Sequence, residues 1–263
     1  MIAAGDISRA LAGLGVGEGD TLFVHSGLKG ALRLAGATRE EKLDTLAGGL
    51  RDSVRGGVLV LPTFTYSFTR GEPYDRSRSP SAVGVLSERF RTLADVRRTA
   101  DPIFSCAVLG ELPGPWAERL LRIGDQDCFG PRSIFAFLAE TDAKLLFLGV
   151  DFEMCTYVHH VEQQLGVPYR HLKDFRGTVV DGDERAAVTA RYYVRDREAD
   201  VESHFAPLRD ALLQGGLAIT ATLERGPGLL VTSARAVAAE IERRLATNPD
   251  FLLRRGHAAA TAP

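Results

Sequence analysis

The sequence predicts an α/β protein with a mostly parallel central sheet flanked by helices. Short, almost wholly apolar runs recur along the first two thirds of the chain, as in buried parallel strands. Amphipathic segments with helix-start signals lie between these runs, so strand and helix alternate. From Phe175 the pattern changes, which predicts an appended part built from a β-hairpin and helices.

The amino-terminal elements are a short helix, a buried strand and a second helix. Asp6 is suited to cap the first helix. The apolar run 21–24 predicts the first strand. Thr38 and Glu41 form a capping-box pattern, which predicts a helix that continues to about Val54.

The middle of the chain repeats this alternation around a polar loop. Apolar runs predict three further strands, at 58–61, 103–109 and 143–150. Helical spacing predicts two further helices, at 83–90 and 156–165. The segment Arg70 to Pro80 is rich in Arg, Asp, Ser and Pro, as loops that bind ligands are.

The last third predicts a hairpin followed by helices. The two hairpin arms are 177–180 and 187–194, around the turn Asp181-Gly182-Asp183. Two helices flank two short strands, at about 200–213 and 234–246. We therefore expect one domain over 1–255, with a core at 1–174, an appended part at 175–255 and a disordered tail at 256–263.

Composition restricts the classes of function. The chain has 263 residues, a formal net charge of −2 and an isoelectric point near 6.3, which argues against a nucleic-acid partner. No apolar run approaches the roughly 20 residues that a membrane span requires. The three cysteines lie outside any CxxC spacing, which predicts neither disulfides nor a zinc site and suits the cytoplasm. The oligomeric state is left open, a homodimer included.

The most informative stretch joins the apolar run 143–150 to the helix after it. If Thr156 caps that helix, His159 lies in its first turn. Spacing of three residues places His159 and Glu162 on one face, while His160 points about 100° away. On spacing alone the pair also fits a surface contact, but its place at a strand end favours a site. A neutral imidazole oriented by a carboxylate is suited to deprotonating an amine.

A second candidate site is the strand-to-turn junction His25-Ser26-Gly27-Leu28-Lys29. Small residues let backbone N–H groups approach a ligand, so this turn can hold an anion or an amide chain. It matches neither a P-loop nor the Gly-x-Gly-x-x-Gly fingerprint, so nucleotide hydrolysis and a dinucleotide cofactor lack support. A purely structural turn is the alternative.

Ordered matches between about Gly19 and Phe175 resemble the aminoglycoside 3-N-acetyltransferases and their relatives in sugar and natural-product pathways. The stretch from Gly166 to Phe175 is more similar to those pathway relatives than to resistance enzymes. The matching segments follow the chain from the first strand to the helix that carries His159; they are Val24 to Leu28, Leu61 to Phe64, Tyr74 to Ser81, Gly84 to Arg91, Asp101 to Gly110, Phe129 to Ser133, Thr156, His159 and Glu162. Such a series is more specific than any single motif.

The resemblance implies a fold distinct from the GNAT superfamily and an acetyl-CoA or other acyl-CoA donor, with no metal ion. It implies that His159 is the general base, that Glu162 orients it and that Thr156 lies near the thioester. The expected donor contacts are His25, Ser26, Gly27, Leu28, Lys29 and Ser105. The expected contacts of the amine acceptor are Tyr66, Asp75, Arg76 and Glu88.

The acceptor is expected to be a primary amine of an amino sugar or a related small molecule. The loop from Arg70 to Ser81 mixes carboxylates with arginines, which suits an acceptor that carries both an amine and an anionic group. A nucleotide-linked amino sugar is an example. The alternative is an aminoglycoside-modifying enzyme that confers antibiotic resistance.

Three departures from the family pattern bear on specificity and mechanism. The family usually has a second serine where Gly27 stands, often histidine where Asp101 stands, and asparagine where Cys155 stands. Cys155 beside a helix start also raises the alternative of a covalent acyl-thioester, against the expected direct attack by the amine.

Other classes of function remain as alternatives. A metal-dependent hydrolase would use His25, His159, His160 and Glu162 as ligands. However, neighbouring residues on a helix diverge, and the two-histidine i,i+4 arrangement of helical zinc sites is missing. A binding module without catalysis is a third class, but it leaves the pairing of His159 with Glu162 unexplained.

Overall fold

A computed structural model describes residues 1–27, 33–196, 201–223 and 228–255. Its main feature is a seven-stranded sheet in the order β11-β12-β7-β1-β2-β5-β4. The strands are β1 Thr21–Ser26, β2 Val58–Pro62, β4 Arg97–Arg98, β5 Cys106–Leu109, β7 Lys144–Leu148, β11 Ala218–Thr222 and β12 Gly228–Ser233. The tail expected to be disordered, 256–263, lies outside the described residues.

The sheet is mixed, which corrects the prediction of a mostly parallel one. β7, β1 and β2 run parallel at its centre. The neighbouring pairs on both sides are antiparallel: β12 with β7, β11 with β12, β2 with β5, and β4 with β5. A strand buried on both faces has the same apolar sequence pattern whether it runs parallel or antiparallel to its neighbour. The direction of each strand therefore could not be deduced from its apolar run.

The two faces of this sheet are buried under separate groups of helices, which confirms the α/β class. Side chains alternate along a strand, so Leu22 and Val24 face one core while Phe23 faces the other. The first core includes three helices: α1 Ala4–Ala12, α2 Arg39–Ser53 and α3 Val85–Phe90. The second includes α4 Trp116–Leu121, α5 Ile134–Glu140, α6 Tyr157–Leu165, α7 Ala206–Gln214 and α8 Ala234–Leu245.

The helix-start signals are only partly met. Thr38 accepts a hydrogen bond from the backbone of Glu41 at 3.2 Å, and the Glu41 carboxylate accepts one from the Thr38 backbone, as the capping box predicts. Asp6 does not precede α1 but lies in its first turn, where its carboxylate accepts a hydrogen bond from the backbone N–H of Ala3. Thr156 precedes α6 as predicted, although its side chain does not cap the helix.

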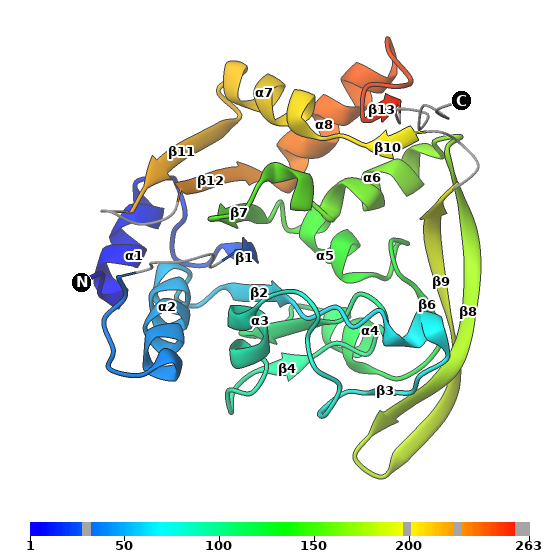
Figure 1. The fold of residues 1–263 in the computed structure, drawn as a ribbon, viewed down its shortest axis with the longest axis horizontal. Coiled ribbons are helices and arrows are strands. Elements are labelled where there is room, and N and C mark those ends of the chain that lie inside the picture. The colour runs from blue at the N-terminus through cyan, green and yellow to red at the C-terminus, as the bar shows by residue number, and fades with distance from the viewer. Residues whose placement is uncertain (28–32, 197–200, 224–227, 256–263) are drawn as a thin grey trace, which may run out of the picture.

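A long hairpin forms a second sheet at the right of Figure 1, on the opposite side of the molecule from α1 and α2. β8 Arg170–Asp181 and β9 Glu184–Arg195 pair along their whole length, so the hairpin begins five residues before Phe175. Two short strands complete this sheet in the order β3-β8-β9-β6; they are β3 Tyr74–Asp75 and β6 Gln126–Asp127. The remaining pair is β10 Val201–Ser203 with β13 Leu253–Arg255.

The segments on either side of position 175 share one sheet. β12 pairs with β7 over five residue pairs, so the carboxyl-terminal third completes the central sheet. Phe205 and Leu208, at the start of α7, are buried in the same core as Phe147 of β7. This arrangement brings the start of α7 close to the start of α6, where the candidate site lies.

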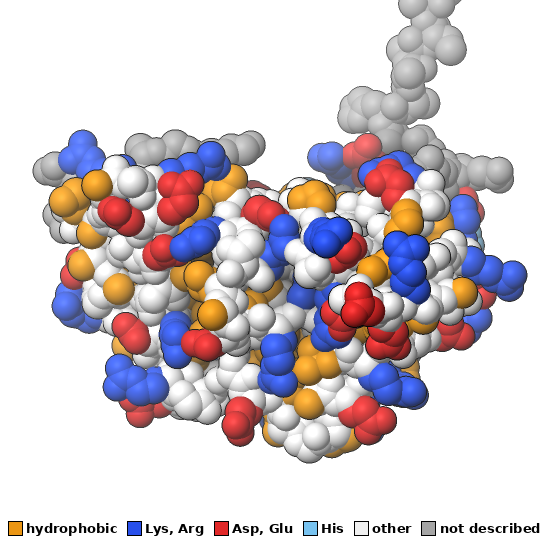
Figure 2. Space-filling view, turned by 90° about the horizontal axis from the view of Figure 1, so that it is seen from below, with side chains coloured by type: hydrophobic (Ala, Val, Ile, Leu, Met, Phe, Trp, Pro, Cys, Tyr) orange, Lys and Arg blue, Asp and Glu red, His pale blue; other side chains and the backbone are white. Residues whose placement is uncertain are grey.

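The surface mixes charges of both signs. On the face shown in Figure 2, the described Lys and Arg side chains are interspersed with Asp and Glu, and hydrophobic side chains occur in small groups. Among the described helices, none combines the length and the apolar character needed to cross a bilayer.

Candidate functional site

His159 occupies the first turn of α6, beyond the carboxyl end of β7. Its Nδ1 lies 2.7 Å from Oε2 of Glu162, one turn further along the helix. The His159 side chain is 18% exposed, whereas that of Glu162 is completely buried. The His159 imidazole is therefore oriented by a buried carboxylate, and the pair is not a solvated surface contact.

Glu162 has two further partners that come from β8 and the turn before it. The Tyr169 hydroxyl donates to Oε1 at 3.1 Å. Nε of Arg170 lies 2.7 Å from Oε2, in an ion pair whose N–H is not directed at that oxygen. The Arg170 side chain is 4% exposed. Three groups, His159, Tyr169 and Arg170, thus surround one buried carboxylate and compensate the cost of burying its charge.

The electrostatics favour a neutral imidazole and an ionised carboxylate. Burial lowers the pKa of His159, the Arg170 guanidinium lowers it further, and Glu162 opposes both effects. Burial alone would raise the pKa of Glu162, but its contacts with His159, Arg170 and Tyr169 outweigh burial and lower it. His159 is consequently in its basic form at neutral pH.

Two cavities meet at His159. The strand-end cavity, about 400 Å³, lies at the carboxyl ends of β1 and β2, and its lining includes His25, Ser26, Pro62, Phe64, Val150, Cys155 and Thr156. The hairpin-side cavity, about 840 Å³, lies against β8 and β9, and its lining includes Arg70, Arg170, His171, Lys173, Tyr192 and Arg195. His159 and Tyr66 line both cavities. A base at such a junction can contact two substrates at once.

Tyr66 has a backbone conformation that is uncommon for its residue type. Its φ of 57° and ψ of −10° place it in the left-handed region, immediately before the 3-10 turn Ser67–Arg70. Strain of this kind is concentrated at functional sites. Its ring packs edge-on against Phe64 and Phe104 at 6.2 Å and 5.9 Å between centroids. Tyr66, an expected acceptor contact, therefore lies on the wall between the two cavities.

His25 links the end of β1 to the start of α6. Its Nε2 accepts a hydrogen bond from the backbone N–H of Thr156 at 3.4 Å, and its ring stacks on Phe147 at 4.8 Å. Burial lowers the pKa of His25 to about 3, so the ring is neutral. His25, Ser26 and Thr156 thus line the strand-end cavity together.

The other expected donor contacts are placed differently. Gly27 abuts Val150 and Gly149 at the end of β7. Ser105 is fully buried, and its hydroxyl donates to the Thr63 carbonyl and accepts from the Nε of a buried arginine at 3.2 Å. Ser105 lines neither cavity. Leu28 and Lys29 lie outside the described residues.

Asp75 and Glu88, two expected acceptor contacts, line neither cavity. Both bind the polar loop from Arg70 to Ser81. Oδ1 of Asp75 accepts hydrogen bonds from the backbone N–H groups of the two residues after Arg76. Glu88 accepts from the backbone N–H of the last loop residue at 2.7 Å and forms an ion pair with Arg91. These carboxylates therefore stabilise the loop.

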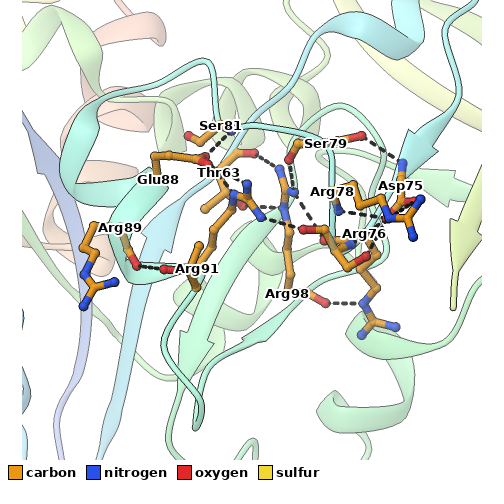
Figure 3. A network of polar contacts seen from close by, with 12 residues as sticks. Thr63, Asp75, Arg76, Arg78, Ser79, Ser81, Glu88, Arg89, Arg91 and Arg98 are labelled. Carbon is orange, nitrogen blue, oxygen red and sulfur yellow. Dashed lines mark hydrogen bonds and ion pairs between the residues drawn. The ribbon is translucent and has the colours of Figure 1, made fainter.

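Arg76 is also held by the protein itself. Its side chain is 15% exposed and pairs with Asp181 at 2.6 Å. Its Nε donates to the backbone carbonyl of Arg98, and the buried Arg98 guanidinium donates to the carbonyls of Thr63 and Ser79. Figure 3 shows this network, in which the arginines bind the loop to β4. The structure does not bring Asp75, Arg76 and Glu88 to His159.

The histidines named for a metal site point to separate partners. His160 is buried, and its Nδ1 contacts the Phe129 carbonyl oxygen at 2.7 Å. His25 contacts Thr156, and His159 contacts Glu162. Within the described part of the chain, no group of three or more potential ligand side chains converges. This geometry gives the metal-dependent hydrolase no support.

Several residues at the site were missed in the sequence. Tyr169 and Arg170, which contact Glu162, belong to the stretch noted for its resemblance to pathway relatives, but no role at the site was predicted for them. The same is true of Lys173, and Arg195 was not named at all; both line the hairpin-side cavity. The positions 171, 173 and 175 have a spacing of two and line that cavity together. This period of two is a consequence of strand β8, but apolar and polar residues do not alternate between Arg170 and Phe175, so no local pattern extended the hairpin toward the site.

Comparison with known proteins identifies the family of this chain. The sequence profile of the aminoglycoside 3-N-acetyltransferase family matches residues 23–245. Aminoglycoside N(3)-acetyltransferase IV from Salmonella sp. is 33% identical over 199 residues, which cover 71% of each chain. Aminoglycoside N(3)-acetyltransferase VII from Streptomyces paromomycinus is 28% identical over 222 residues, covering 73% of this chain and 70% of the relative.

Solved structures show the same fold. The crystal structure of aminoglycoside acetyltransferase AAC(3)-Xa superposes with a TM-score of 0.78 at 22% identity, covering 95% of this chain and 94% of that one. AAC-IIIb, solved as a binary complex with CoASH, gives a TM-score of 0.74 at 21% identity over 92% and 97% of the two chains. The chain therefore belongs to the aminoglycoside 3-N-acetyltransferase family.

Proposed function

We propose that this protein transfers the acetyl group of acetyl-CoA to a primary amine of a small molecule, with His159 as the general base. The observation that carries the proposal is the position of His159 at the junction of two cavities, with Nδ1 bound to the buried carboxylate of Glu162. Nε2 is then the ring nitrogen that faces substrates. The relative solved with CoASH supports a coenzyme A donor.

The strand-end cavity suits the donor. Much of its lining is apolar, with Pro62, Phe64 and Val150, and His159 forms part of its wall. A pantetheine arm needs a mostly apolar cleft with a few polar groups for its amides. Ser26 and Thr156 supply hydroxyl groups on the cavity wall. We place the thioester near Thr156.

The reaction then needs one proton transfer and one acyl transfer. Nε2 of His159 takes a proton from the acceptor amine while the amine nitrogen attacks the thioester carbonyl carbon. The resulting tetrahedral species collapses, the C–S bond breaks, and coenzyme A leaves as a thiolate, which takes up the proton from the His159 imidazolium and so restores the neutral base. Glu162 stabilises the imidazolium that forms at His159. The products are the N-acetyl amine and free coenzyme A.

A transfer assay tests the proposal. Thiol release from acetyl-CoA is measured with a panel of amines for the parent protein, His159→Ala and His160→Gln. Loss of a general base lowers turnover by roughly 10² to 10⁴, while binding of coenzyme A persists. His160→Gln is the matched control, because His160 lies on the same helix and contacts the Phe129 carbonyl in the core.

The control variant should keep its turnover per folded molecule. Near-normal turnover of His159→Ala, with the parent active, would remove His159 from the proposed role. The absence of thiol release by the parent with every amine would contradict the proposed reaction.

A further inference from the structure

The hairpin-side cavity is lined by positive charge. Among the described residues, its lining includes four permanently cationic side chains and one carboxylate; they are Arg70, Arg170, Lys173, Arg195 and Asp196. His159 forms part of the same wall. The cavity, of about 840 Å³, is large enough for a sugar with a charged substituent.

Two of these cations are already neutralised. Arg170 is paired with the buried carboxylate of Glu162, and Arg70 with a neighbouring carboxylate at 3.0 Å. By contrast, Lys173 and Arg195 form no ion pair with a carboxylate in the described part of the chain. Lys173 Nζ instead lies 5.2 Å from the ring centroid of Phe175, at a cation–π distance. Lys173 and Arg195 are therefore the charges available to a ligand.

The register of the hairpin explains why the lysine and the aromatic rings share a face. Lys173 of β8 is paired with Tyr192 of β9, and His171 with Val194. Directly paired residues project from the same side of a sheet, and alternate residues along a strand do likewise. Lys173 and the rings of Phe175 and Tyr192 therefore lie together on the face that lines the cavity. Arg195, which is paired with Arg170, starts from the opposite face and lines the cavity from the last position of β9.

We propose that the acceptor carries a phosphate or a comparable anion in addition to its reactive amine, and that Lys173 and Arg195 bind this anion. The proposal rests on the proposed function, because it assigns the acceptor to the cavity that shares His159 with the donor cavity. Charge-assisted hydrogen bonds from lysine and arginine are suited to phosphate oxygens. A polycationic aminoglycoside would instead meet like charge, which costs affinity.

The same phosphate chemistry occurs in coenzyme A itself. If the cations bound the donor's phosphates, variants of Lys173 would weaken coenzyme A binding. If they bind the acceptor, coenzyme A binding is unchanged and the acceptor KM rises. The two sources are thus separated by measuring both quantities on the same variants.

The experiment compares glucosamine, glucosamine 6-phosphate, UDP-glucosamine and kanamycin as acceptors. It uses the parent, Lys173→Met, Arg195→Met and the control Arg176→Met, whose residue lies on β8 but does not line the cavity. For at least one phosphorylated amine, we expect a kcat/KM above those of glucosamine and kanamycin. Lys173→Met and Arg195→Met should each lower it by about tenfold or more, mainly through KM.

The remaining readouts decide between the explanations. Arg176→Met should match the parent, and the coenzyme A Kd should be unchanged in all variants. A coenzyme A Kd that rises in Lys173→Met while the acceptor KM stays constant would assign the cations to the donor and overturn the proposal. Preference for kanamycin with insensitivity to both variants would overturn it too, while leaving the proposed acetyl transfer intact.

A direct binding measurement covers the case in which none of the four amines is acetylated. UDP-glucosamine is titrated into the coenzyme A complex by calorimetry, for the parent and for Lys173→Met. Binding that is weakened by the variant supports the anion site even if the proposed reaction fails. Absence of binding to the parent contradicts the anion site.

Discussion

The end of β1 shows how closely single residues are fitted around the strand-end cavity. A Cβ atom added to Gly27 would lie 2.4 Å from Cγ1 of Val150 and 3.0 Å from the carbonyl oxygen of Gly149. Val150 thus occupies the space that a side chain at position 27 would need. Gly27, one of the positions expected to depart from the family pattern, therefore has a bulky neighbour.

We expect Gly27→Ser to destabilise the fold by about 1 to 3 kcal/mol, because the new side chain overpacks against Val150. Val150→Ala should relieve part of this cost when the two substitutions are combined. Denaturant unfolding of the two single variants and the double variant gives the coupling free energy. Strictly additive effects would show that the two residues do not compete for space.

Cys155 is a second residue whose role follows from its surroundings. Its side chain is completely buried, and burial raises the pKa of its thiol to about 12. The thiol is therefore protonated at neutral pH and is a poor nucleophile. This favours direct attack by the amine over an acyl-thioester on Cys155.

Cys155→Ala should consequently retain most of its turnover. Initial-rate plots at several fixed acceptor concentrations should intersect, because both substrates are bound before transfer. Mass spectrometry after mixing with acetyl-CoA alone checks for a covalent adduct. Parallel plots together with an acetylated Cys155 would require the two-step route.

At the scale of elements, the main contact at the site joins helix α6 to strand β8 through the ion pair between Glu162 and Arg170. His159 and Glu162 come from α6, and Arg170 comes from the first position of β8. The Arg170 guanidinium also donates to the Tyr193 carbonyl and to the Ser203 hydroxyl. One buried side chain thus joins the helix that carries the base to the hairpin and to β10.

This pairing predicts opposite pH shifts for two variants. Burial and Arg170 lower the pKa of His159, while Glu162 raises it. Because the basic form is active, kcat/KM rises with pH through the pKa of His159, which lies below its ordinary value of 6.5. Arg170→Gln should move this acid limb of kcat/KM to higher pH, and Glu162→Gln should move it to lower pH with a reduced plateau.

Arg170→Lys keeps the charge and is the control for Arg170→Gln. Its acid limb should stay close to that of the parent. A reduced plateau with an unchanged acid limb in both neutral variants would mean that the two residues act only through the fold.

At the scale of the whole molecule, His25 couples stability to pH. The ring is 5% exposed, and burial lowers its pKa from 6.5 to about 3. The unfolded chain takes up a proton near pH 6.5, whereas the folded chain does so only near pH 3. The contribution of the neutral His25 ring to the free energy of unfolding is therefore complete above about pH 6.5, and it is lost as the pH falls toward 3.

We expect the free energy of unfolding of His25→Gln to fall less steeply than that of the parent between these pH values. Glutamine can still accept a hydrogen bond from the Thr156 backbone N–H, but it does not titrate. Urea unfolding at several pH values measures the two slopes. Equal slopes would show that His25 does not carry this dependence.

Local patterns in the sequence determined which segments form elements and which residues pair at short range. The apolar runs 21–24, 58–61 and 143–150 became the three central strands, and spacing alone placed His159 beside Glu162. These features depend on residues that are neighbours along the chain. Backbone periodicity brings such residues together whatever the rest of the fold is.

Tertiary structure alone decided the strand directions, the partners of Glu162 and the surroundings of each loop charge. Arg76 pairs with Asp181, 105 positions away, and so supports the fold away from the cavity. Lys173 and Arg195 belong to opposite arms of the hairpin and line the same cavity as His159 only because of how the hairpin packs. Contacts between distant residues depend on how the elements pack in three dimensions, which no local period encodes.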